Sequence, residues 1–307
     1  MQLNLGTPWP WAWYTPCTHS PLHPVVTVLE ILQSTTAYFA QRGIESPRLN
    51  IEHLLADALG KRRLDLYLEF DRTVSEHELG ILRAKVRRRA EREPLQHVLG
   101  HWDFFGRRFK TDRRALIPRP ETELLVEEAL IRLPGTVPGR LAIDVGTGSG
   151  VIGITLALER PDLQVVGIDQ SEQALALASE NASLHQVTSR VRFAAGDLLS
   201  SIVPEPAADL IVANLPYIPT AQIAGLAAEV RRDPVAALDG GPDGLQLIRR
   251  LIRDARFSLK PGGFLALEIG AGQAAEVGNL LAAEKYRDIF TRKDYQGVIR
   301  VVGASYG

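Results

Sequence analysis

The feature that most constrains the fold is the alternation, from Arg140 onward, of short β-rich runs with helical segments. The runs are "RLAIDVG", "LQVVGIDQ", "VRFAAGD", "DLIVANLP", "GGFLALEIG" and, near the end, "VIRVVGA". Strands that alternate with helices in this way form a mostly parallel sheet covered by helices on both faces. In such sheets ligands bind beyond the carboxyl ends of the strands, so the residues that follow each run are the candidates for chemistry.

A glycine-rich turn, "DVGTGSGVIGI", closes the first run. Its glycines allow a tight turn and a close approach of the backbone to a ligand at the N-terminus of the next helix. The predicted cofactor loop consists of Gly146, Thr147, Gly148, Ser149 and Gly150. The stretch from Gly148 to Gly153 also satisfies the dinucleotide pattern G-x-G-x-x-G, and an acid follows at Asp169. By itself the loop does not distinguish a nicotinamide dinucleotide from S-adenosyl-L-methionine.

Acidic residues at the ends of three runs favour S-adenosyl-L-methionine, with S-adenosyl-L-homocysteine as product. Asp144 precedes the glycines, where a carboxylate repels a pyrophosphate and attracts a cationic amino-acid group, directly or through water. Asp169 is placed to accept hydrogen bonds from ribose hydroxyls, which either cofactor requires. Asp197 follows the third run, where its carboxylate can accept from an adenine amino group while Leu198 packs on the ring.

The fourth run ends in "VANLPYIP", residues 212–219, where the proline ends the strand. The side-chain carbonyl of Asn214 and the backbone carbonyls around Pro216 can accept two N–H bonds from one substrate NH2 group. An amide or ring amine is a poor nucleophile, and two fixed acceptors orient its nitrogen and offset the positive charge that develops on it. Tyr217 can stack on the planar group. Asn214, Pro216 and Tyr217 are the predicted catalytic residues; Leu215 joins them in substrate binding, and Asn214 also borders the cofactor.

The chain before Arg140 has a different pattern of apolar residues. Residues 25–93 show helical spacing of apolar residues and predict a small helical domain, residues 94–123 predict a linking β-hairpin, and residues 124–307 the sheet domain. The helical domain is assigned to substrate recognition as an expectation. Residues 1–24 contain five prolines and no Lys or Arg. They are interpreted as a disordered extension, with an aromatic docking peptide as the alternative. His97 and His101 stand four apart, but no third ligand has suitable spacing, so no metal site is predicted.

The composition limits the classes of molecule that the chain is expected to bind. The chain has 35 Lys plus Arg against 36 Asp plus Glu, a net charge of -1, so it carries no general attraction to nucleic acid or anionic lipid. Neither a membrane nor a direct nucleic-acid partner is expected. Cys17 is the only cysteine, which excludes an intrachain disulfide, and the N-terminus lacks the pattern of a signal peptide. We therefore expect a cytoplasmic protein.

Six motifs together resemble the protein-(glutamine-N5) methyltransferases of the HemK/PrmC family: "PRPETE", "DVGTGSG", "GID", "NLPYIP", "ALDGGPDGL" and "LEIG". The resemblance implies a class I S-adenosylmethionine-dependent methyltransferase fold, Rossmann-like, with a small N-terminal helical domain. It implies methyl transfer to the side-chain amide nitrogen of the glutamine in the Gly-Gly-Gln motif of class 1 peptide-chain release factors. One departure is Leu215, where the family has a first proline; both acceptors remain, and the loop loses rigidity.

Alternatives stay open at the level of sequence. A ribosomal-protein glutamine methyltransferase shares the loop, and a nucleic-acid adenine-N6 methyltransferase poses the same problem of orienting a flat NH2 group. An NAD-dependent oxidoreductase would explain only the glycine pattern, and a ribosome-associated binding module with a decayed site would explain neither motif. Within "PRPETE", the resemblance implies a hinge and lid, while Arg119 could equally be a structural ion-pair partner.

Overall fold

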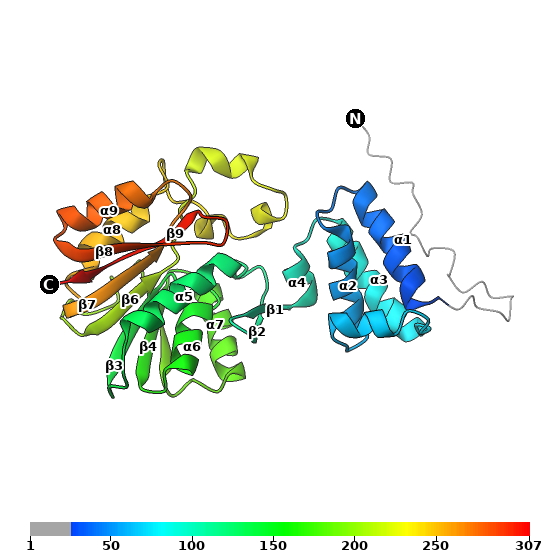
Figure 1. The fold of residues 1–307 in the computed structure, drawn as a ribbon, viewed down its shortest axis with the longest axis horizontal. Coiled ribbons are helices and arrows are strands. Elements are labelled where there is room, and N and C mark those ends of the chain that lie inside the picture. The colour runs from blue at the N-terminus through cyan, green and yellow to red at the C-terminus, as the bar shows by residue number, and fades with distance from the viewer. Residues whose placement is uncertain (1–25) are drawn as a thin grey trace, which may run out of the picture. The chain divides into compact units, whose positions relative to one another are not determined.

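The structure is a computed structural model that describes residues 26–307. The described residues form two compact units, one that ends at Leu99 and one that spans Gly100–Gly307 (Figure 1). The predicted extension over residues 1–24 lies outside the described part of the chain. Within residues 26–307, no helix combines the length and the apolar character needed to cross a bilayer.

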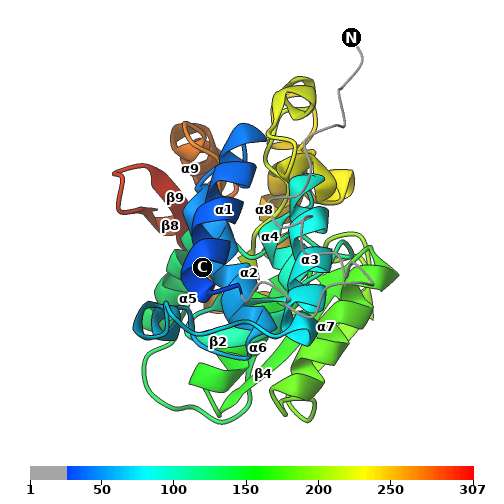
Figure 2. The same cartoon turned by 90° about the vertical axis from the view of Figure 1, so that its right-hand side faces the viewer.

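The first unit is helical, as the spacing of its apolar residues predicts. Its elements are α1 (Val28–Gln41), α2 (Pro47–Ala58), the 3-10 helix η2 (Arg63–Leu68), α3 (Glu76–Ala90) and the short α4 (Leu95–Leu99). Thr27 and Ser75 begin α1 and α3 with capping boxes, in which each side chain accepts from a backbone N–H of the first turn. Helices α1, α2 and α3 pack side by side and bury residues such as Phe39, Leu55 and Leu82 (Figures 1 and 2).

The segment predicted as a linking hairpin contains more than a hairpin. The hairpin itself is β1 (His101–Phe104) paired with β2 (Arg107–Lys110). Helix α4 precedes it, and α5 (Pro120–Arg132) begins within the last residues of the predicted segment, with proline at its first position. His97 lies in α4 whereas His101 begins β1, so the two histidines do not share a helix.

A seven-stranded sheet forms the second unit. Its strands are β3 (Arg140–Val145), β4 (Leu163–Asp169), β5 (Val191–Ala195), β6 (Ala208–Ala213), β7 (Leu259–Glu268), β8 (Tyr286–Lys293) and β9 (Ile299–Tyr306), in the order β5-β4-β3-β6-β7-β9-β8. Strands β3 to β7 are parallel, and β9 runs antiparallel to both β7 and β8. The fold predicted from the sequence is confirmed. The sequence reading missed β8, because this edge strand is mostly exposed and lacks an apolar run.

Helices cover both faces of this sheet (Figure 1). Side chains of α5, α6 (Val151–Glu159) and α7 (Glu172–Leu184) pack with Ala142 on one face, whereas α8 (Gln246–Ala255) and α9 (Ala274–Ala283) pack with Ile143 on the other. Short 3-10 helices, η3 (Thr220–Gly225), η4 (Val230–Arg232) and η5 (Val235–Ala237), lie between β6 and α8. Because β3 pairs with both β4 and β6, the strand order reverses there, and a crevice at the ends of these strands is expected to bind the ligand.

Candidate active site

A cavity of about 190 Å³ lies beyond the carboxyl ends of β3, β4, β5 and β6. Ten of the residues that the sequence singled out line it: Gly146, Thr147, Gly148, Ser149, Asp169, Asp197, Leu198, Asn214, Leu215 and Pro216. Three others, Asp144, Gly150 and Tyr217, lie outside its lining. The structure therefore brings most of the predicted set to one place, and the exceptions have separate physical reasons.

Asp144 lies beneath the glycine loop, residues 146–150, and is fully buried. Its Oδ2 accepts hydrogen bonds from the Thr147 hydroxyl at 2.6 Å and from the Gly153 backbone N–H at 2.9 Å, so it fastens the loop and the start of α6 to the end of β3. Within the described chain, no hydrogen bond reaches its Oδ1. Burial raises the pKa of Asp144 to about 6, against the two hydrogen bonds, which lower it.

The glycines of the loop serve two different purposes. Gly146 has a φ of +70°, and a Cβ there would lie 2.9 Å from the Leu215 side chain, so the loop passes directly beside the residue that follows Asn214. Gly150 has a φ of +82°, and its Cβ would meet Ile154 at 2.8 Å and Ala178 at 3.1 Å. Gly150 thus permits close packing of α6 on α7, which explains why it does not line the cavity.

The half-buried Asp169 and the exposed Asp197 are held in different ways. Asp169 accepts one backbone N–H on each oxygen, from Gly148 and from Ser171, both at 2.9 Å. This arrangement joins the glycine loop to the end of β4 and leaves further lone pairs on the carboxylate. Asp197 accepts from the Arg250 guanidinium of α8 at 2.7 Å. Leu198 beside it has a φ of +54° and is buried at the cavity wall.

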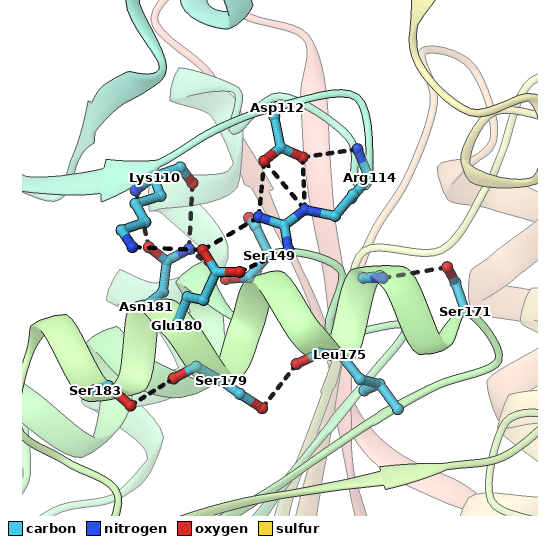
Figure 3. A network of polar contacts seen from close by, with 11 residues as sticks. Lys110, Asp112, Arg114, Ser149, Ser171, Leu175, Ser179, Glu180, Asn181 and Ser183 are labelled. Atoms are coloured by element: carbon cyan, nitrogen blue, oxygen red, sulfur yellow. Dashed lines mark hydrogen bonds and ion pairs between the residues drawn. The ribbon is translucent and has the colours of Figure 1, made fainter.

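A polar network joins the segment around Lys110 and Arg114 to α7 and to Ser149 of the glycine loop (Figure 3). The fully buried Asn181 of α7 accepts from the Lys110 N–H at 2.8 Å and donates to the Ser149 carbonyl at 2.9 Å, so it ties the hairpin to the glycine loop. Nearby, the guanidinium of Arg114 bonds both Asp112 and Glu180. Arg114 lines the cavity, and these bonds hold it in place.

Asn214 follows β6 and is held by a second network. Its Nδ2 donates to the Thr122 hydroxyl at 3.0 Å. Burial raises the pKa of the nearby Glu268 carboxyl group to about 7, and hydrogen bonds from Thr122 and Asn214 lower it. Within residues 26–307, Asn214 Oδ1 accepts no hydrogen bond, and no backbone hydrogen bond outside the strand ladders ends on the Leu215 or Pro216 carbonyl. These oxygens are therefore available to accept the N–H groups of a bound molecule.

A second cavity, of about 230 Å³, adjoins the first. The two share lining residues that include Asn214, Leu215 and Pro216, while Tyr217 and Arg300 line only the second. Burial raises the pKa of Tyr217 to about 12, helped by the negative charge of Glu268, so its hydroxyl stays protonated at neutral pH. The "NLPY" loop thus forms the boundary between two chambers, which suits the transfer of a small group from one bound molecule to another.

Arg119 forms the ion pair that the sequence left as one alternative. Its guanidinium donates to Asp233 at 2.9 Å, and the Ile117 backbone N–H also bonds to this carboxylate. Burial raises the pKa of Asp233 to about 6, while Arg119 and the Ile117 N–H lower it. Pro234 and Ala237, which follow Asp233, line the first cavity. The pair therefore ties the "PRPETE" segment to the loop across the cavity.

Several residues that line the cavity or bond to residues of the site were not predicted from the sequence. They are Thr122, Ala115, Ser171, Arg250, Leu247, Asp233 and Glu268. Glu268 belongs to "LEIG", the run that ends β7, and its position at a strand end was the one signal that could have identified it. Thr122 and Asp233 lie in a helix and a loop whose sequences give no sign of their partners.

Fold and cavities together define a class I methyltransferase domain with an added helical domain, and comparisons with known proteins agree. Residues 138–279 match the family model of a methyltransferase domain, and residues 30–100 match that of the PrmC N-terminal domain. A methyltransferase from Pyrococcus furiosus shares the fold, with a TM-score of 0.50 and 17% identity over 66% of this chain and 91% of its own.

Curated relatives cover nearly the whole chain. A release factor glutamine methyltransferase of Geobacter sulfurreducens is 44% identical over 282 residues, 92% of this chain and 97% of its own. One from Chlorobaculum tepidum is 41% identical over 288 residues, 91% and 97% of the two chains. The chain belongs to the release factor glutamine methyltransferase family, and the resemblance seen in its motifs is confirmed.

Proposed function

We propose that this protein transfers a methyl group from S-adenosyl-L-methionine to the side-chain amide nitrogen of the glutamine in the Gly-Gly-Gln motif of class 1 peptide-chain release factors. The observation that carries the proposal is the state of Asn214 at the boundary of the two cavities. Its Nδ2 is engaged by Thr122, which leaves Oδ1 as the atom that can accept from a substrate. Family membership supplies the substrate class.

The first cavity fits the adenosyl amino acid. The glycine loop approaches the cavity without Cβ atoms at Gly146 and Gly148, and Asp169 retains lone pairs for ribose hydroxyls. Leu198 and Leu247 offer apolar walls for a flat ring system. The orphaned Oδ1 of Asp144, buried under the loop, adds negative charge close to where a cationic amino-acid group would lie. When bound, the sulfonium supplies an electrophilic methyl group.

The second cavity receives the acceptor. Asn214 Oδ1 and a backbone carbonyl at Leu215 or Pro216 accept the two N–H groups of the glutamine amide, and Tyr217 covers its plane. In the transfer a nitrogen–carbon bond forms as the sulfur–carbon bond breaks, and the nitrogen then releases one proton to solvent. The two acceptors align the nitrogen and offset its developing positive charge, so no strong base is required.

A release factor acts in translation, so this acceptor would place the reaction in the cytoplasm. Two enzyme alternatives remain as outcomes of the test: a ribosomal-protein glutamine and a nucleic-acid adenine. A nicotinamide oxidoreductase is disfavoured, because residues 138–279 match a methyltransferase domain.

The test is transfer of label. The protein is incubated with S-adenosyl-L-methionine that carries a labelled methyl group and, in separate reactions, with release factor, ribosomal proteins, RNA or DNA. We expect label on the release factor and none on a release factor whose Gly-Gly-Gln glutamine is replaced by alanine. Label on RNA, DNA or a ribosomal protein instead would contradict the proposal, as would equal label on the alanine-substituted factor.

A further inference from the structure

Three residues that are far apart in the chain meet behind the "NLPY" loop. Thr122 comes from the first turn of α5, Asn214 follows β6, and Glu268 ends β7. Thr122 and Glu268 are each 2% exposed. The Thr122 hydroxyl accepts from Asn214 Nδ2 at 3.0 Å. Hydrogen bonds from Thr122 and Asn214 lower the pKa of the Glu268 carboxyl group, whose Oε2 has no hydrogen-bond partner among the described residues. Neither Thr122 nor Glu268 has a role in the transfer described above.

We propose that Thr122 and Glu268 are positioning residues, which fix the orientation of the Asn214 amide and through it the orientation of the acceptor amide. The inference rests on the proposed function, because the direction of Asn214 Oδ1 matters for the reaction only if this oxygen binds the acceptor amide. The substrate itself does not contact Thr122 or Glu268 in this scheme; they act on it only through Asn214.

An amide has a donor end and an acceptor end of nearly the same shape, so packing alone does not select between its two orientations. An ionised carboxylate only accepts hydrogen bonds. Ionised Glu268 therefore requires the donor Nδ2 on its side and makes the Thr122 hydroxyl donate to it, which leaves the Thr122 oxygen to accept from Nδ2.

The opposite orientation is penalised at the same point. A flipped Asn214 would direct Oδ1 at the Glu268 carboxylate and the Thr122 oxygen, both acceptors in the arrangement observed. Buried acceptors left facing one another lose their hydrogen bonds and repel. Nδ2 would then point at the N–H groups of the substrate, so the acceptor amide would not be held. A buried carboxylate behind Asn214 also polarises its amide and makes Oδ1 a stronger acceptor.

The charge state of Glu268 decides how firmly this constraint holds. Burial raises its pKa to about 7, hydrogen bonds from Thr122 and Asn214 lower it, and the neighbouring charges are Glu121 of α5, which raises it, and Arg300 of β9, which lowers it. Tyr217 also faces this group and stays neutral. Protonated Glu268 carries its own donor, so it tolerates either orientation of Asn214. The rate should therefore fall as the pH drops through about 7.

Kinetic variants test the positioning role. Thr122→Val keeps the shape but removes the hydroxyl, and we expect it to lower the maximal methylation rate about tenfold with little change in the KM for release factor, since a positioning contact acts mainly on the transition state. Thr122→Ser, which restores the hydroxyl, should recover most of the rate. Glu268→Gln removes the ionisation and should flatten the decline of the rate below pH 7. Equal rates for the Val and Ser variants, or an unchanged pH profile in Glu268→Gln, would overturn the proposal.

A second readout separates this inference from the proposed function. In the amide NMR spectrum of the isotope-labelled protein, the side-chain signals of Asn214 are those that disappear in Asn214→Ala. They should shift with a midpoint near pH 7 in the parent and stay constant in Glu268→Gln. If the parent methylates no release factor but this titration appears, the proposed function fails and the network stands. If methylation occurs but the signals of the parent and Glu268→Gln behave alike, the positioning inference is wrong and the proposed function stands.

Discussion

The two sides of the site are built in opposite ways. On the side proposed for the cofactor, which comprises residues 146–149, Asp169 and Asp197, the Asp169 carboxylate is held by backbone N–H groups of Gly148 and Ser171. On the side proposed for the acceptor, which comprises Thr122, Asn214, Tyr217 and Glu268, the Asn214 amide donates to the Thr122 side chain of another element, beside the buried carboxyl group of Glu268. One side is made mainly of turns at strand ends, and the other mainly of side-chain contacts across the sheet domain.

This difference predicts that substitutions on the two sides affect different quantities, cofactor affinity on one side and methylation rate on the other. Backbone donors and a glycine loop form a rigid receptacle, so changes on the cofactor side should act mainly on affinity. A chain of oriented side chains sets the direction of a single acceptor atom, so changes on the acceptor side should act mainly on rate. Substitutions on either side, and in the loops that join the two sides, test this difference.

The largest effect is expected for Asn214→Ala. Deleting a preorganised partner of the reacting group should lower single-turnover methylation of release factor by about 10²-fold or more. Affinity for S-adenosyl-L-methionine, measured by calorimetry, should stay within a few-fold of the parent. Asn279→Ala, at an exposed position on α9, is the matched control and should change neither quantity. Near-normal turnover in Asn214→Ala would mean that the loop is only a surface turn.

A smaller loss, of affinity rather than rate, is expected for Asp169→Ala. Loss of charge-assisted hydrogen bonds to the ribose should weaken S-adenosyl-L-methionine binding by roughly 1.5–3 kcal/mol, about 10- to 100-fold in Kd. Glu172→Ala, three residues further on and exposed, serves as control for the change of charge. Calorimetry that gives the same Kd for Asp169→Ala and the parent would remove Asp169 from the cofactor side.

Arg119→Ala should act on stability. It leaves the buried Asp233 carboxylate without its cation, at a cost of about 1–2 kcal/mol after allowance for the partial exposure of Arg119. The melting temperature should fall by about 3–6 °C at pH 7. The folded pKa of Asp233 already lies above its ordinary value and would rise further, so protonation at pH 5 should restore part of the loss.

The exposed Arg231→Ala, in the same loop, is the control for Arg119→Ala and should melt like the parent at both pH values. A melting temperature of Arg119→Ala that is equally low at pH 5 and pH 7 would mean that the ion pair with Asp233 is not the cause.

Leu215→Pro should give the smallest effect. Proline restricts the backbone and stabilises the folded protein by about 0.4–1 kcal/mol where the native conformation accepts it. The Leu215 N–H donates no backbone hydrogen bond within the described residues, so proline removes none. The substitution also removes part of a buried side chain that packs beside Gly146, so the two contributions oppose each other. Single-turnover rates should stay within about threefold of the parent. A collapse of the rate would show that the Leu215 side chain, rather than the loop backbone, shapes the site.

The two sides also differ in how far the sequence revealed them. Residues 146–149, Asp169 and Asp197 were found because each follows a strand run and strand ends of a parallel sheet share one edge. Asn214 was found for the same reason. Thr122 and Glu268 were not, because Thr122 is one of several polar residues in a helix and its partners lie 92 and 146 positions away. Such contacts exist only once the sheet domain has folded.

The sequence also predicted a contact of Asp144 with the cofactor. Its position in the chain does not tell whether the carboxylate lies at the cavity wall or beneath the loop, and the structure places it beneath, bonded to Thr147 and Gly153. The missed strand β8 has a related cause, since an exposed edge strand carries little apolar pattern. Patterns of apolar and glycine residues predict elements and turns, whereas burial of polar groups follows from packing.

The most direct test compares the parent protein with Asp169→Ala and Asn214→Ala. For each protein it measures the Kd for S-adenosyl-L-methionine and the single-turnover rate of release-factor methylation at saturating cofactor. The account predicts a crossed pattern. Asp169→Ala should lose affinity by roughly 10- to 100-fold and keep most of its saturated rate, while Asn214→Ala should keep affinity and lose about 10²-fold in rate. Variants that both lose affinity and rate together, in the same proportion, would contradict it.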